Sequence, residues 1–135
     1  LDDTVVLAKE LKARGVDVID CSSGGLMGSA TAARIKRGPG FQVPFAERVR
    51  KDAGLATMAV GLILDPHFAE QILQAGQADL IAIGRQALYD PSWPLHAEIA
   101  LGAEGAYESW PQQYGWWLDK RQHIMTDELK KKAGG

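Results

Sequence analysis

Two glycines, each placed directly after a short apolar run, form the pattern in this sequence that best fits ligand chemistry. Residues 58–60 lead into Gly61, and residues 81–83 lead into Gly84 and Arg85. A glycine at the carboxyl end of a strand lets a ligand approach the backbone closely, and an arginine offers an anion a fixed fork of donors. The spacing therefore predicts a phosphate site formed by Gly61, Gly84 and Arg85.

The elements that must position these residues alternate between helix and strand. Asp65 and Pro66 are typical of a helix start, and Gly54 and Gly76 are typical of helix ends. This order favours parallel strands joined by right-handed crossovers. The apolar runs predict three strands, each with a helix before it, over residues 16–21, 55–61 and 78–83.

The chain opens with the pattern of a helix. Val6, Leu7 and Leu11 recur at helical spacing and indicate its apolar face, and Gly15 marks its end. Because this helix belongs to the alternating array, we expect that a further segment precedes Leu1.

Three parallel strands cannot close a barrel, but this chain has the length of the last part of one. An eight-stranded barrel takes about 250 residues, and its phosphate site is commonly built from the loops after its seventh and eighth strands. We therefore predict an α/β fold in which residues 1–125 form about three of the eight strand–helix units of a TIM barrel. Residues 126–135 are polar, and we expect them to form a frayed tail.

The composition favours one globular unit without a nucleic-acid or membrane function. Of the 135 residues, 46% are hydrophobic and 24% are charged, and the formal net charge is -2. Nucleic-acid binding needs a basic excess, and a membrane span needs about 20 consecutive apolar residues. The sequence has neither, so we expect a cytoplasmic protein. The single cysteine, Cys21, ends an apolar run and is expected to be a buried, unreactive thiol.

The stretch of residues 26–42 is long for a connection and carries Gly38, Pro39 and Gly40. Loops of this length are usually functional, so we expect it to face the ligand. Ser22 and Ser23 precede it and are open to two interpretations, as ordinary caps or as contacts at the rim of the site.

Five motifs, taken together in their order and spacing, connect the chain to a known family. They are VDVIDCSSGG (16–25), PGFQVPFA (39–46), ATMAVGLI (56–63), ADLIAIGR (78–85) and DPSWP (90–94). Over residues 7–118 the chain resembles the C-terminal part of the Old Yellow Enzyme family, in its thermophilic-like branch of ene-reductases and xenobiotic reductases. The resemblance implies an FMN-dependent oxidoreductase. Such an enzyme uses NADPH or NADH to reduce an activated carbon–carbon double bond in a small enone, enal or nitroalkene.

The resemblance also implies which residues take part. It assigns the FMN phosphate to Gly61, Gly84 and Arg85. The family's substrate-holding histidines and proton-donating tyrosine belong to earlier strands, so it assigns no catalytic residue and no metal ligand here, and the chain alone is expected to be inactive. In this branch a C-terminal arginine or tryptophan reaches the neighbour's active site. Trp117 matches that tryptophan best and Trp116 second, which implies a substrate contact and a homo-oligomer.

Two other functions fit the residues. One is a phosphate-binding TIM-barrel enzyme without redox chemistry, which would use the same site for a sugar phosphate or a nucleotide. The other is a non-catalytic half-barrel that only associates, with itself or with a complementary half. Three strands leave two open sheet edges, and open edges favour such pairing.

Overall fold

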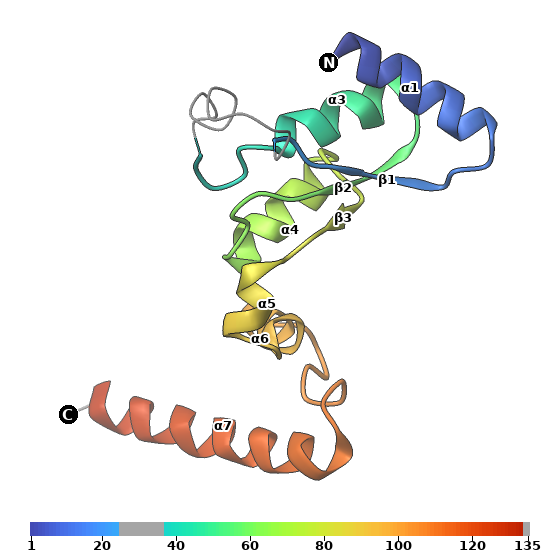
Figure 1. Cartoon of the computed structure of the whole chain (residues 1–135). Helices are drawn as coiled ribbons and strands as arrows, with labels where there is room; N and C mark the ends of the chain where they lie inside the picture. Colours follow the sequence, from blue (N-terminus) through green and yellow to red (C-terminus); the bar gives the residue numbers. More distant parts are fainter. Residues whose placement is uncertain (25–36, 134–135) are drawn as a thin grey trace. The chain divides into compact units, whose positions relative to one another are not determined.

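The computed structural model describes residues 1–24 and 37–133, which fall into two compact units (Figure 1). The first unit is Leu1–Tyr89 and the second is Asp90–Gly135. The strands of the described residues all belong to the first unit. Most of the loop that we expect to face the ligand, residues 26–36, lies outside the described residues.

A parallel sheet forms in the first unit, as predicted. Ile19 pairs with Thr57, and Met58 pairs with Leu80. Each strand is shorter than predicted: β1 begins two residues later, and β2 and β3 also end earlier. The apolar run of β2 continues into a turn at Gly61, where the backbone φ is 123°. The strands, in their order in the sheet, are β1 (Val18–Cys21), β2 (Ala56–Ala59) and β3 (Leu80–Ile81).

Helices precede and follow these strands. Asp65 caps α4 as predicted, because its carboxylate accepts the backbone N–H of Phe68 at 2.8 Å. Gly54 ends α3 in the left-handed conformation (φ 62°), which glycine adopts without steric cost. The helices of the first unit's described residues are α1 (Asp2–Ala13), α3 (Val43–Ala53), α4 (Pro66–Gln74) and α5 (Arg85–Tyr89).

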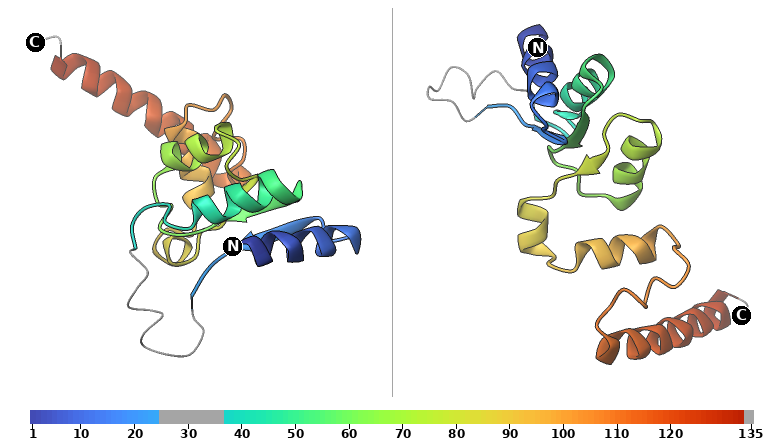
Figure 2. Two further views of the ribbon diagram at one scale, coloured as in Figure 1. Left: turned by 90° about the horizontal axis from the view of Figure 1, so that it is seen from above. Right: turned by 90° about the vertical axis from the view of Figure 1, so that its right-hand side faces the viewer.

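Helix α1 buries a different face from the one predicted. Val5 and Ala8 are buried, whereas Val6 and Leu7 are 63% and 54% exposed. Helices α1 and α3 lie side by side (Figure 2). Because alanine is a weak hydrophobic signal beside valine and leucine, periodicity alone indicated the wrong face.

The core lies between α3 and the sheet. Ala46 and Val49 of α3 are fully buried, and so are Thr57 and Ala59 of β2. Side chains of a strand alternate between faces, so Thr57 and Ala59 share the face that α3 covers. Cys21 is buried as predicted, and its burial raises the pKa of the thiol, which keeps it in the unreactive protonated form.

The second unit contains α6 (Trp93–Ala100) and α7 (Gln112–Ala133), and no helix was predicted over residues 112–133. Gly115 disfavours a helix by propensity. In the structure it is buried, and a Cβ at this position would lie 2.4 Å from the carbonyl oxygen of Tyr107. Glycine therefore lets α7 approach the preceding turn closely. The division at residue 125 and the fraying of the tail stay predictions.

Within residues 1–24 and 37–133, no helix is both long enough and apolar enough to cross a bilayer.

A polar cluster joins the amino ends of β2 and β3. Asp79 Oδ2 accepts the backbone N–H of Thr57 at 2.9 Å, and Arg50 Nε donates to both carboxylate oxygens of Asp79 at 3.0 Å. Arg50 Nη1 also donates to the carbonyl oxygen of Gly76 at 3.1 Å, just after α4. The Thr57 hydrogen bond, and after it the Arg50 guanidinium, lower the pKa of Asp79. The cluster thus connects α3 to both strands.

Asp79→Ala should lower the free energy of unfolding by about 1–3 kcal/mol, because the buried Thr57 N–H loses its acceptor. Since folding lowers the pKa of Asp79, its carboxylate stabilises the protein above the unfolded pKa of about 3.9. That contribution is lost as the pH falls through the folded pKa. The stability difference from wild type should be full at neutral pH and shrink below about pH 4, which urea unfolding of the complete protein measures.

Asp17→Ala is the matched control, because Asp17 is exposed and makes no hydrogen bond or ion pair among the described residues. We expect it to leave stability nearly unchanged at every pH. An equal loss in both variants would contradict the role given to Asp79. So would a difference that does not vary with pH.

Candidate functional site

A cavity of about 290 Å³ opens at the carboxyl ends of β2 and β3. The structure brings Gly61, Gly84 and Arg85, the three residues predicted for a phosphate site, to this one cavity. The segments that place them, residues 60–64 and 82–86, directly follow the two strands. Parallel pairing puts both carboxyl ends at the same sheet edge, so the convergence follows from the topology.

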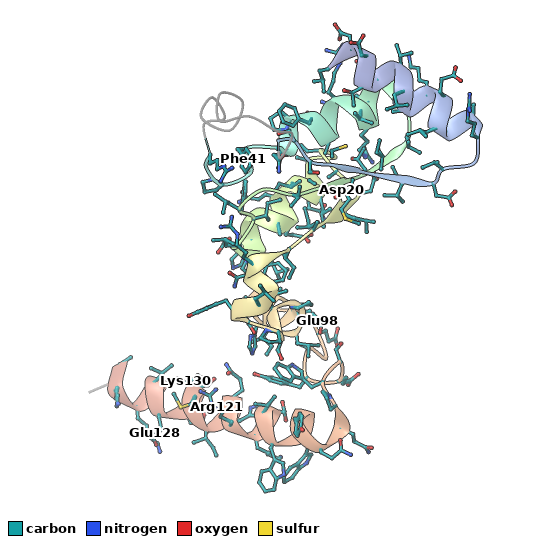
Figure 3. All side chains as sticks on the ribbon, in the orientation of Figure 1. Asp20, Phe41, Glu98, Arg121, Glu128 and Lys130 are labelled. Carbon is teal, nitrogen blue, oxygen red and sulfur yellow. The ribbon has the colours of Figure 1, made fainter. Side chains whose placement is uncertain are left out.

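Gly61 is held in contact with the segment that precedes α3. Its carbonyl oxygen accepts the backbone N–H of Gly40 at 2.8 Å. Phe41 lies in the segment before α3 (Figure 3). Its ring lies against Gly61, and a Cβ at Gly61 would meet two ring carbons at 3.0 Å. Gly61 has φ 123°, and Leu62 follows with φ 53°, an uncommon value for a non-glycine residue. Position 61 therefore requires glycine for both its backbone conformation and its packing.

The space beside Gly84 is open, whereas the space beside Gly61 is filled by the Phe41 ring. No atom lies within 4 Å of the place where its Cβ would be, and its φ is not positive. The backbone N–H groups of Gly61 and Gly84 donate to no acceptor among the described residues. A ligand can therefore approach the backbone here and find donors.

The charged residues of the cavity lining are all arginines. Among the described residues, Arg37 and Arg85 line it, and no carboxylate does. The side chain of Arg85 makes no hydrogen bond or ion pair with the described residues. Elsewhere in residues 1–24 and 37–133, no group of three or more His, Cys, Asp or Glu side chains could hold a metal ion. The cavity has the donor set that an anion needs.

Ser23 connects the segment after β1 to the start of α3. Its backbone N–H and its hydroxyl both donate to Gln42 Oε1, the hydroxyl at 2.8 Å. Gln42 is only 5% exposed, and both residues line the cavity. The interpretation of Ser23 as a rim residue fits this placement. Ser22 lines a separate hollow beside β1, which Ser23 lines as well.

The sequence analysis did not single out Arg37, Phe41 or Gln42 as site residues. Their signal was the turn-forming run of glycine and proline at 38–40, which indicated a functional loop but not which side chains it would present. Those side chains reach the cavity only because the turn docks on Gly61, a contact between residues about twenty positions apart in the chain.

Trp117 lies on α7 in the second unit. It is 67% exposed, and its ring meets that of Trp116 edge to face at 4.5 Å and 84°. Lys120 Nζ lies 5.6 Å from the centre of the Trp116 ring. These contacts are within one helix, and the substrate contact of Trp117 stays a prediction.

Comparison with known proteins identifies the family. A family model described as the NADH:flavin oxidoreductase / NADH oxidase family matches residues 2–104. The chain belongs to this family. The expected resemblance to the Old Yellow Enzyme family is confirmed, and the three-stranded parallel sheet is part of a TIM barrel, as predicted.

Curated relatives of this chain include three proteins named NADPH dehydrogenase. The one from Halalkalibacterium halodurans is 46% identical over 114 residues, which are 84% of this chain and 32% of the relative. The one from Bacillus subtilis is 50% identical over 102 residues (76% and 29%), and the one from Listeria welshimeri is 44% identical over 116 residues (84% and 32%). The chain thus spans about a third of the length of the curated relatives it matches.

Gly61→Ala should lower the free energy of unfolding by about 1–3 kcal/mol, because alanine is strained at this positive φ. Its Cβ would also press on the Phe41 ring. Gly84→Ala is the matched control, since its Cβ would enter open space, and we expect nearly unchanged stability. Thermal unfolding of both variants in the absence of ligand measures the contrast. Equal melting temperatures would show that the turn is not held against Gly61 as described.

Proposed function

We propose that the protein carrying this chain is an FMN-dependent NAD(P)H oxidoreductase, and that this chain binds the FMN phosphate at Gly61, Gly84 and Arg85. The observation that carries the proposal is the convergence of these three residues on one cavity, whose described lining contains two arginines and no carboxylate. Family membership supports a flavin as the ligand. The family also favours redox chemistry over the alternative of a phosphate-binding barrel enzyme without it.

The residues present fit the phosphate end of FMN. A phosphate monoester needs hydrogen-bond donors and positive charge, and the cavity offers the unpaired N–H groups of Gly61 and Gly84 together with the Arg85 guanidinium. Gly84 leaves the backbone open to close approach. When bound, the flavin supplies the hydride chemistry, and these residues hold and orient it.

The substrate class and the reductant follow from the family resemblance. We propose reduction of the activated carbon–carbon double bond of enones, enals or nitroalkenes in a cytoplasmic homo-oligomer. The relatives are named NADPH dehydrogenase, which favours NADPH over NADH. The third possibility, a half-barrel that only self-associates, stays a prediction that the size of the protein in solution tests.

Arg85→Ala should weaken FMN binding about ten- to a hundredfold, because it removes a charged hydrogen bond worth about 1.5–3 kcal/mol. Lysine should rescue binding only partly, since it keeps the charge and loses the planar fork. The measurement is FMN affinity from flavin fluorescence in the complete protein, with NADPH oxidation in the presence of an enone as the activity readout. Wild-type protein that binds no flavin would overturn the function, whereas an unchanged FMN affinity in Arg85→Ala would overturn only this assignment.

Trp117→Ala should change the Michaelis constant and the preference among enones while leaving FMN affinity nearly intact. The physical reason is that an exposed aromatic ring on α7 can contact the substrate of a neighbouring subunit without supporting its own fold. Trp116→Ala is the matched control, because the two rings are neighbours with similar exposure. Steady-state kinetics with several enones distinguishes them. Unaltered selectivity in Trp117→Ala, or the same change in both variants, would contradict the role.

A further inference from the structure

Arg37 provides a second guanidinium at the cavity. It lines the same hollow as Gly61, Gly84 and Arg85, although it comes from the segment before α3 rather than from a strand end. Its side chain makes no hydrogen bond or ion pair with the described residues. In the part of the lining that the structure describes, no carboxylate neutralises it.

The other described arginines of the first unit behave differently. Arg14 pairs with Glu10 at 3.6 Å, Arg48 with Asp2 at 3.2 Å, and Arg50 with Asp79 at 3.0 Å. Among residues 1–24 and 37–89, only the two arginines at the cavity have no carboxylate partner. Two like charges that share an uncompensated cavity repel one another, and an anion between them removes that cost.

The backbone beside Arg37 is fixed to the site. Residues 38–41 form a turn in which the Phe41 N–H donates to the Gly38 carbonyl oxygen at 3.1 Å. The next contact, from the Gly40 N–H to the Gly61 carbonyl oxygen at 2.8 Å, attaches this turn to the end of β2. The position of Arg37 therefore follows from the same contacts that build the phosphate cavity.

We propose that Arg37 and Arg85 together neutralise the phosphate monoester of FMN, an inference that rests on the proposed function. A phosphate monoester carries about −1.5 to −2 charges near pH 7, so one arginine compensates only part of it. Two arginines match that charge. A phosphodiester carries one charge per phosphate, so the pair selects a terminal phosphate.

The test compares FMN with riboflavin, which has the same ring and ribityl chain but no phosphate. Arg37→Gln in the complete apoprotein should weaken FMN binding about tenfold and leave riboflavin binding unchanged, because the lost contact is a charged hydrogen bond to phosphate. Arg37→Lys should restore the affinity only partly, since it keeps the charge and loses the planar fork. Arg14→Gln is the matched control, because Arg14 pairs with Glu10 and lines no part of this cavity.

The results distinguish a failure of the proposed phosphate site from a failure of the role given to Arg37. If the wild-type protein binds FMN no better than riboflavin, the phosphate site itself is wrong. If the wild type prefers FMN and Arg37→Gln keeps the full preference, only the role of Arg37 is overturned. An unchanged FMN affinity with a raised Michaelis constant for NADPH, but not for NADH, would likewise overturn it and indicate the 2′-phosphate of the nucleotide. Circular dichroism of each variant verifies the fold.

Discussion

The parallel register of β2 with both neighbours is the constraint on which the rest of the first unit depends. Ala59 is fully buried, and it pairs with Cys21 on one side and Ile81 on the other. Because parallel strands end at the same edge, this pairing decides that Gly61 and Gly84 follow their strands at one place. The cavity is thus a consequence of sheet topology before any side chain is considered.

The charged side chains at the two ends of β2 and β3 differ in whether they are paired. At the amino ends, Asp79 is compensated by Arg50 and by the Thr57 N–H, so every charge has a partner. At the carboxyl ends, Arg37 and Arg85 have none among the described residues. Paired charges stabilise the folded protein by themselves, whereas two unpaired like charges repel one another. The electrostatic stabilisation by Asp79 and Arg50 therefore lies at the amino ends, and the proposed anion site lies at the carboxyl ends.

The sequence predicted the alternation of helices and strands, the parallel sheet, and three residues that share the cavity. These predictions depend on local signals. Asp65 caps α4 by accepting the N–H of Phe68, three residues later in the chain. Gly54 ends α3 because glycine adopts the left-handed conformation without steric cost. The buried face of α1 was missed because it depends on packing beside α3. Helix α7 was missed because Gly115 disfavours a helix by propensity, and the reason for this glycine is its close approach to the Tyr107 carbonyl oxygen.

What the sequence alone determined is the order of the elements and the residue types at each strand end, since hydrophobic periodicity and turn chemistry act over a few residues. What only the tertiary structure decided is which loop residues reach those ends. The Phe41 ring packs against Gly61, and Gln42 accepts a hydrogen bond from Ser23. The turn at residues 38–41 bonds to the end of β2 and brings Arg37 to the cavity. No local pattern encodes those contacts, because they form only when the segment before α3 docks on the completed sheet.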